Sequence, residues 1–139
     1  MRFVHTNVRV RDVDASLRFY AALGFERRGR LQFDGAYNVY LGLPGDGDTL
    51  ELTVNEAREE SYDLGDGYGH VALAVEDLDG LLARLAEQGI EPEKPPYAPG
   101  GRSEFRICFL QDPDGYRIEL IDGDFATPQA RDPAAEDGA

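Results

Sequence analysis

The stretch His5-Thr-Asn-Val-Arg-Val-Arg-Asp-Val-Asp14 decides the fold, because the chain contains it twice in related form. It aligns without a gap on His70-Val-Ala-Leu-Ala-Val-Glu-Asp-Leu-Asp79, and the two copies hold both histidines of the chain. Farther along, the triplet Leu50-Glu-Leu52 corresponds to Ile118-Glu-Leu120. A repeat of this length predicts one compact domain made of two half-size units of similar fold.

The order of strands and helices follows from the hydrophobic pattern. In the first repeat, residues 3–10 alternate and are rich in β-branched types, which indicates a strand. A helix is expected over Ala15–Leu23, with Asp12 or Asp14 as its N-cap and Gly24 at its end. Three more strands complete a βαβββ unit and are expected around residues 25–32, 38–43 and 49–54.

The second repeat is expected to follow the same plan after a linker at residues 55–69. Its expected elements are a strand at 70–75, a helix at 78–88, a loop rich in Pro and Gly at 91–103, and strands at 105–110 and 116–121. We therefore predict an α+β fold in which two βαβββ repeats form a curved mixed sheet around a cavity. Residues 1–122 make up this single domain, and residues 123–139, which lack periodicity, are expected to be a flexible tail.

Composition excludes several classes of protein. The formal charge of −13, from 27 acidic and 14 basic residues, argues against a nucleic-acid partner because phosphate binding needs clustered cations. The apolar runs are too short to span a membrane, and no targeting signal is recognisable at the N-terminus. The single cysteine, Cys108, has no partner for an internal disulfide and is expected to pack in the core. These features predict a soluble, cytoplasmic protein.

Four residues at matched positions of the two repeats point to a metal ion. Glu51 and Glu119 each lie between two apolar residues of a predicted strand, where a charge is costly unless it is paired or ligated. His5 and His70 lie in the first strand of each repeat. Any one of the four is more simply read as an ordinary hydrogen-bonded or surface side chain, but their shared register favours a common partner. Two His and two Glu with water suit octahedral Ni²⁺, Co²⁺ or Zn²⁺.

Two more polar residues share strand faces with the predicted ligands. Arg9 lies four residues after His5, and Asn55 lies four after Glu51, so both are expected to point into the same cavity. There they would hold a carboxylate and an amide of a polar substrate, whereas the alternative for Arg9 is a surface ion pair. Arg102, beside Gly100-Gly101, is a candidate clamp for an anion at the mouth of the cavity, or else a solvated loop charge.

These motifs resemble those of the vicinal-oxygen-chelate superfamily and, within it, the short bacterial glyoxalase I (lactoylglutathione lyase) family. The resemblance covers residues 1–122, and its most specific stretches are Ser16-Leu-Arg-Phe-Tyr20, Leu50-Glu-Leu-Thr-Val-Asn55, Tyr68-Gly-His-Val-Ala-Leu-Ala-Val75 and Asp112-Pro-Asp-Gly-Tyr-Arg-Ile-Glu-Leu120. It implies that glutathione is held by Arg9 and Asn55 and that the metal ligands are His5, Glu51, His70 and Glu119. Departures from the family pattern in the first helix, at Glu56 and at Arg102 leave the identity of the thiol open.

The resemblance implies isomerisation of the hemithioacetal of methylglyoxal and a small thiol to an S-lactoylthiol through an enediolate. Glu119 is the first choice for the catalytic base, while Glu51 either serves the other face of the substrate or remains a ligand. A homodimer is implied in which His5 and Glu51 of one chain meet His70 and Glu119 of the other. Short chains of the family resemble the kind activated by Ni²⁺ or Co²⁺. The alternatives are another metal-dependent enzyme of the superfamily, such as an epimerase or thiol transferase, and a metal-free drug-binding protein.

Overall fold

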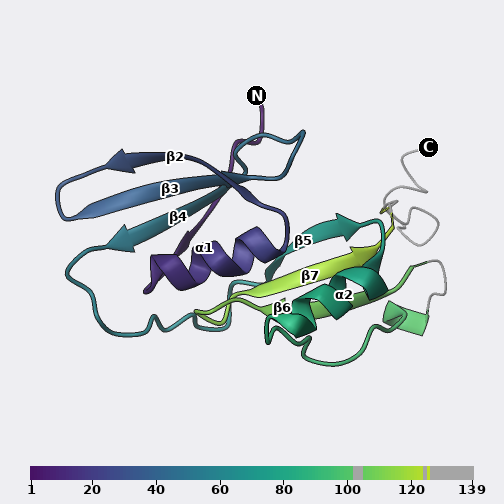
Figure 1. Cartoon of the computed structure of the whole chain (residues 1–139). Helices are drawn as coiled ribbons and strands as arrows, with labels where there is room; N and C mark the ends of the chain where they lie inside the picture. The colour runs from purple at the N-terminus through teal and green to yellow at the C-terminus, as the bar shows by residue number, and fades with distance from the viewer. Residues whose placement is uncertain (102–104, 124, 126–139) are drawn as a thin grey trace, which may run out of the picture.

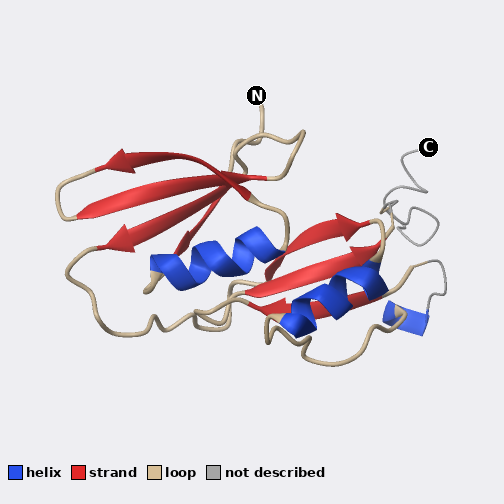
Figure 2. Cartoon of the chain, viewed as in Figure 1, coloured by secondary structure: helices blue, strands red, loops and turns tan. Residues whose placement is uncertain are grey.

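The computed structural model describes residues 1–101, 105–123 and 125 of the chain. These residues form two sheets, one from each repeat, and each sheet is accompanied by one helix (Figure 1, Figure 2). The α+β fold class predicted from the sequence is confirmed.

The first repeat builds a four-stranded sheet in the order β1-β4-β3-β2. Its strand β1 runs parallel to β4, and the other neighbouring pairs are antiparallel. The first strand is shorter than predicted, so His5 lies directly before it. The elements of this repeat are β1 (Thr6–Arg9), α1 (Val13–Ala22), β2 (Glu26–Gln32), β3 (Ala36–Gly42) and β4 (Leu50–Asn55).

The second repeat builds a three-stranded sheet in the order β5-β7-β6. Strand β5 is parallel to β7, as β1 is to β4, and β6 is antiparallel to β7. A short 3-10 turn, Pro99–Gly101, precedes β6 and was not predicted. The longer elements of this repeat are β5 (His70–Val75), α2 (Leu78–Glu87), β6 (Ile107–Gln111) and β7 (Arg117–Asp122).

Within the described residues, the second repeat has one strand fewer than the first. The segment in the place of that strand makes a single bridge to β6, between Tyr97 and Ile107. A further backbone bond joins the N–H of Glu93 to the carbonyl of Phe109 at 2.8 Å. Between these contacts lies Pro95-Pro96, which lacks the two N–H groups that a strand ladder needs. The segment therefore lies alongside β6 as a loop and does not form a regular strand. This agrees with the loop predicted at residues 91–103.

Both helices begin at an aspartate in the same position of the repeat. Asp12 and Asp77 each accept a hydrogen bond from the backbone N–H three residues later, at 3.1 and 3.0 Å. Of the two predicted caps for α1, the structure therefore selects Asp12 over Asp14. Each helix is followed by a glycine in the left-handed region, Gly24 with φ 99° and Gly89 with φ 77°. No helix in the described part of the chain is long and apolar enough to cross a membrane.

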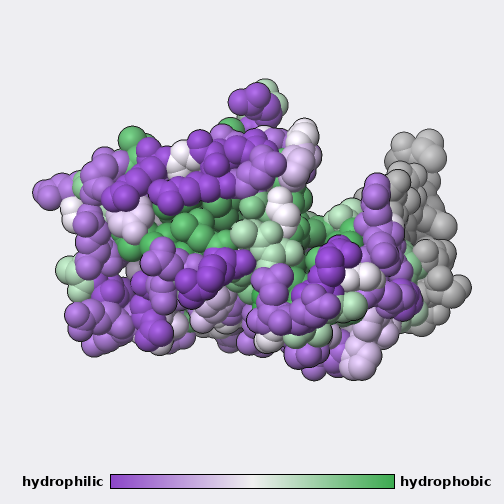
Figure 3. Space-filling model, viewed as in Figure 1, coloured by the Kyte–Doolittle hydropathy of each residue, from purple (hydrophilic) through white to green (hydrophobic). Residues whose placement is uncertain are grey.

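The two repeats share one hydrophobic core. Its buried side chains come from both sheets and include Val39 and Leu52 of the first repeat and Leu110 and Leu120 of the second. Cys108 is buried in this core, as predicted, and burial raises the pKa of its thiol. On the face drawn in Figure 3, apolar residues gather in the middle between polar rims. Buried side chains of the two repeats therefore pack against one another.

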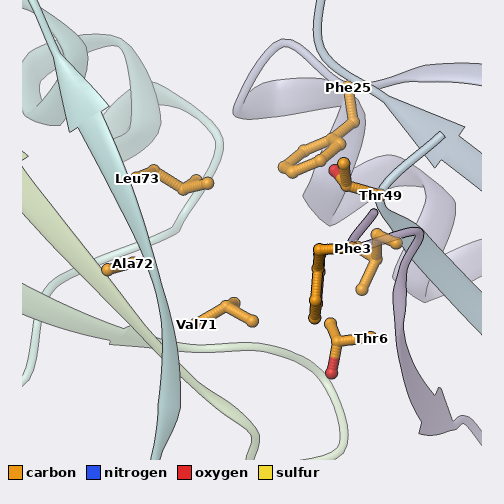
Figure 4. Close-up of a pocket in the computed structure, with 8 residues that line it drawn as sticks. Phe3, Thr6, Phe25, Thr49, Val71, Ala72 and Leu73 are labelled. Carbon is orange, nitrogen blue, oxygen red and sulfur yellow. The ribbon is translucent and has the colours of Figure 1, made fainter. Parts of the chain in front are cut away.

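An apolar pocket of about 210 Å³ lies between the two repeats. Val71 and Leu73 project from β5 toward Phe3 and Phe25 of the first repeat (Figure 4). Side chains alternate along a strand, so Val71 and Leu73 lie on the face of β5 opposite to His70. One face of β5 thus lines the apolar pocket. The predicted metal ligand His70 lies on the other face, away from the pocket.

Candidate metal centre

One half of the predicted metal site forms in the first repeat. The imidazole Nε2 of His5 lies 3.3 Å from Glu51 Oε1. Strand register explains this contact, because the parallel pairing of β1 with β4 sets Asn7 opposite Glu51, and His5 lies two residues before Asn7. The side chains of His5 and Glu51 are 32% and 12% exposed, so the pair is accessible from one side.

The second repeat forms an equivalent half. His70 Nε2 lies 3.5 Å from Glu119 Oε1. The parallel pairing of β5 with β7 sets Ala72 opposite Glu119, which repeats the relation of Asn7 to Glu51. The His70 ring also meets the Phe109 ring edge to face, with 5.1 Å between the ring centroids. Each repeat therefore presents one His/Glu pair on an accessible sheet face.

The four predicted ligands form two pairs and not one cluster. Among the described residues, which include all four ligands, no three His, Cys, Asp or Glu side chains come together as a metal-binding group. A single chain therefore does not close the centre that the sequence predicts from both repeats. Each pair offers two donors, which is half of the four that Zn²⁺ takes in proteins.

The spacing within each pair nevertheless fits adjacent ligands of one ion. Metal bonds of about 2.0–2.2 Å to an imidazole nitrogen and a carboxylate oxygen, at right angles, place the two donor atoms ~3 Å apart. The observed separations of 3.3 and 3.5 Å need only small side-chain movements to reach that value. Imidazole and carboxylate donors without sulfur suit Ni²⁺, Co²⁺ and Zn²⁺. The residues therefore fit a divalent ion, with two ligands from each half-site.

The predicted substrate-binding residues lie on the first repeat, with one exception. Arg9 is exposed at the end of β1, on the same face as Asn7, and its carbonyl accepts a 3.0 Å hydrogen bond from the Tyr116 hydroxyl. Asn55, at the end of β4, donates its amide to the Tyr62 hydroxyl at 2.7 Å, so the linker orients this side chain. Arg102 lies outside the described residues.

Sequence reasoning missed two amides that contact Glu51. Asn7 Nδ2 donates to Glu51 Oε1 at 2.8 Å, and Asn38 Nδ2 donates to Oε2 at 3.1 Å. The alternation of β1 indicates that Asn7 shares a face with His5. The contact of Asn38 depends on the register of β3 against β4, which the sequence alone does not show.

A fixed ion pair borders the second half-site and was also missed. Arg117, two residues before Glu119, pairs with Glu93 at 2.7 Å. Its guanidinium lies over the Phe109 ring, 3.9 Å from the centroid. The hydrogen bond from Arg117 holds the pKa of Glu93 below its usual range. The loop before β6 is therefore tied to β7 beside His70 and Glu119.

Comparisons with known proteins show the family to which the chain belongs. The family model of the glyoxalase/bleomycin resistance protein/dioxygenase superfamily matches residues 2–120. The chain belongs to this superfamily. Its α+β fold is thus that of a known superfamily.

Curated relatives within the superfamily match the chain over most of their length. The probable lactoylglutathione lyase of Synechocystis sp. is 36% identical over 126 residues, which cover 87% of this chain and 95% of that protein. The lactoylglutathione lyase of Salmonella typhimurium is 36% identical over 129 residues, which cover 88% of this chain and 93% of that protein. The lactoylglutathione lyase of Neisseria meningitidis is 37% identical over 129 residues, covering 87% and 90%.

Solved structures of glyoxalase I share the fold. Glyoxalase I from Zea mays has a TM-score of 0.79 and 31% identity, with 91% of this chain and 47% of the maize chain covered. This chain therefore spans about half the length of the maize enzyme. Glyoxalase I from Leishmania major has a TM-score of 0.73 and 34% identity, with 88% and 86% covered. The resemblance to glyoxalase I found in the sequence is confirmed by these matches.

Proposed function

We propose that the chain is a metal-dependent glyoxalase I, which isomerises the hemithioacetal of methylglyoxal and a small thiol to an S-lactoylthiol. The observation that carries this proposal is the pair of equivalent half-sites, His5 with Glu51 and His70 with Glu119. The curated relatives are lactoylglutathione lyases, which confirms the type of enzyme expected from the sequence.

The donor set supports a divalent transition metal. His5 and Glu51 would hold it from one side, and His70 and Glu119 from the other. When bound, the ion supplies Lewis-acid stabilisation for the negative charge that develops on the enediolate oxygens. We propose Ni²⁺ or Zn²⁺ as the resident ion, with Co²⁺ as a third candidate, because two imidazoles, two carboxylates and water suit all three.

Proton transfer is assigned to Glu119. The reaction moves one proton from the carbon that carries the sulfur and the hydroxyl to the neighbouring carbonyl carbon, and the hydroxyl proton moves to the former carbonyl oxygen, so no oxidant or reductant is needed. Within the described residues, the ion-pair contact of Glu119 is His70, at 3.5 Å. Its carboxylate can therefore accept the proton and return it, a role that contributes typically ~10²–10⁴-fold. Glu51, whose two oxygens accept hydrogen bonds from amides, is assigned as a ligand.

We also propose that the active enzyme is a homodimer with shared sites. Each chain presents two half-sites that do not meet, and a second copy related by two-fold symmetry would complete two equivalent centres. His5 and Glu51 of one protomer would then face His70 and Glu119 of its partner. Phe3 and Val4, which are 78% and 57% exposed, lie just before His5 and offer apolar surface for this contact.

The thiol is proposed to bind along the first repeat. Arg9 is positioned for the carboxylate of a peptide-like thiol and Asn55 for its amide, while Arg102 is the candidate for a further anionic group. Glutathione is the first choice, because the curated relatives are lactoylglutathione lyases. The structure of the similar Leishmania major glyoxalase I is described as that of a trypanothione-dependent enzyme, so trypanothione belongs in the assay.

Two further expectations stay predictions. The cytoplasmic location rests on the composition of the chain. The domain boundary at residue 122 coincides with the end of β7, and most of the predicted tail, 123–139, lies outside the described residues.

The direct test is turnover by the metal-loaded protein. The purified chain is stripped with a chelator, reloaded with Ni²⁺, Co²⁺ or Zn²⁺, and assayed for S-lactoylthiol formation from methylglyoxal with glutathione, trypanothione or cysteine. We expect no turnover by the stripped protein and restored turnover with at least one pair of metal and thiol. A protein that takes up metal and isomerises none of these substrates contradicts the proposal.

A further inference from the structure

The duplication allows the surroundings of the two glutamates to be compared position by position. Opposite Glu51, strand register sets Asn7 on β1 and Tyr40 on β3. Opposite Glu119, the same positions are Ala72 on β5 and Phe109 on β6. The first glutamate therefore has polar neighbours where the second has apolar ones.

The next pair of positions shows the same difference. On the first repeat, Asn38 of β3 lies opposite Thr53 of β4. On the second, Ile107 of β6 lies opposite Ile121 of β7, and both are buried. All four polar positions around Glu51 are thus apolar around Glu119, although the His/Glu pairs themselves are alike.

The polar residues form a closed set of hydrogen bonds with Glu51. The amide of Asn7 donates to one carboxylate oxygen at 2.8 Å, and the amide of Asn38 donates to the other at 3.1 Å. The Thr53 hydroxyl joins the two amides, because it accepts from Asn7 Nδ2 at 2.7 Å and donates to Asn38 Oδ1 at 2.7 Å. We call Asn7, Asn38 and Thr53 the amide cradle.

Burial strengthens the part of the cradle around Asn38. Glu51 is 9% exposed and Asn38 is 8% exposed, so water competes poorly for these hydrogen bonds. Rotating the Glu51 carboxylate would break the hydrogen bonds from both amides, and the bond from Asn38 is buried, where its loss is costly. Among the described residues, the side chains at the equivalent positions around Glu119 are apolar and offer its carboxylate no hydrogen bond. The two glutamates therefore differ in freedom of movement, not in their distance from histidine.

We propose that Asn7 and Asn38 are positioning residues that fix Glu51 as a permanent metal ligand and so leave proton transfer to Glu119. This inference rests on the proposed metal site, and it assigns a function to two residues that contact a proposed ligand and are not among the four proposed ligands themselves. Groups that orient a ligand in this way typically contribute ~10–100-fold to metal affinity or activity. The cradle is built into the first repeat only. The first half-site is therefore specialised for holding the metal and the second for proton transfer.

The test measures metal affinity, which needs no turnover. Dissociation constants for Ni²⁺ and Zn²⁺ are determined by competition with a chromogenic chelator for the wild type, Asn38→Leu and Asn7→Leu. We expect ~10–100-fold weaker binding in each variant. Gln32→Leu is the matched control, since it removes an amide from the same sheet that donates to Glu56 and not to Glu51. Its metal affinity should equal that of the wild type.

Two backgrounds show whether the cradle acts through Glu51. In a Glu51→Gln chain, adding Asn38→Leu should weaken metal binding little further. In a Glu119→Gln chain, adding Asn38→Leu should weaken metal binding as much as it does in the wild type. Unchanged affinity in Asn38→Leu, or an equal loss in both backgrounds, overturns the inference. Should the buried Asn38→Leu variant fail to fold, the exposed Asn7→Leu carries the same comparison. If the protein binds metal as described but shows no isomerase activity, the proposed function fails while the cradle stands.

Discussion

The hydroxyl of Tyr20 donates a 2.6 Å hydrogen bond to Asp112 Oδ2 and so joins α1 of the first repeat to the turn before β7 of the second. The other carboxylate oxygen of Asp112 accepts the N–H groups of Asp114 and Tyr116, each at 2.9 Å. Tyr20 is 1% exposed and Asp112 is 5% exposed. Burial raises the pKa of both groups, and the neighbouring Asp112 carboxylate raises that of Tyr20 further. This bond is a buried polar link between the repeats.

Replacing Asp112 should change how stability depends on pH. The pKa of Asp112 is raised in the folded state, so its contribution to stability is present below the unfolded value of about 3.9 and is lost as pH rises through the folded pKa. Asp112→Asn keeps a hydrogen-bonding side chain of the same shape without that titration. We expect the stability of the variant relative to the wild type to increase with pH across the acidic range, measured by urea unfolding. A constant difference from pH 3 to 7 would refute this.

Tyr20→Phe tests the same link from the other side. The substitution leaves Asp112 Oδ2 buried without its donor, which should lower the free energy of unfolding by about 1–3 kcal/mol. In the double variant with Asp112→Asn, the loss should be smaller than the sum of the single losses, because both changes act on the same hydrogen bond. Additive losses in thermal or urea unfolding would show that the two side chains act independently.

The sequence predicted the two His/Glu pairs because duplication places them at the same strand positions. His5 and Glu51, like His70 and Glu119, are brought together by parallel pairing of the first and last strands of each repeat, and this pairing is part of the βαβββ plan. The cap of α1 was narrowed to Asp12 or Asp14 for a local reason, since an aspartate is a favoured residue at the start of an apolar periodic segment.

Other features could not be predicted from the sequence, because they depend on contacts between residues far apart in the chain. The amides of Asn7 and Asn38 reach Glu51 only when β1, β4 and β3 are in the observed register. The link from Tyr20 to Asp112 joins residues 92 positions apart. The separation of the four ligands into two pairs became visible only in the structure, where no three metal-binding side chains of the described residues come together.

Loss of either histidine should remove metal and activity together. His5→Ala and His70→Ala each take away one of four proposed ligands, and removal of a ligand nitrogen weakens binding because affinity depends on the complete donor set. Metal content after gel filtration, measured by mass spectrometry of the elements, should fall far below one ion per chain in both variants. Full occupancy in either variant would disprove its role as a ligand.

Glu119→Gln should separate binding from catalysis. The amide still offers an oxygen to the metal but is a poor proton acceptor, so turnover should fall by ~10²–10⁴-fold while most of the metal is kept. Glu51→Gln is the comparison, and it should affect metal affinity more than Glu119→Gln does, because Glu51 is the restrained ligand. Near-normal turnover by metal-loaded Glu119→Gln would show that Glu119 is not the catalytic base.

The central claim is that each metal centre takes His5 and Glu51 from one chain and His70 and Glu119 from its partner. Mixed dimers test it, since a His5→Ala chain paired with a Glu119→Ala chain places both defects in one site and leaves the other site intact. The matched control pairs His5→Ala with Glu51→Ala, which puts one defect in each site.

The decisive measurement is isomerase activity after co-refolding of these inactive variants, with mixed dimers verified by two affinity tags. We expect the first mixture to regain about half of the wild-type activity per mixed dimer, because one of two symmetric sites is complete, and the control to stay inactive. Verified mixed dimers of His5→Ala and Glu119→Ala that remain inactive would contradict the shared site, since centres closed within one chain would each carry a defect.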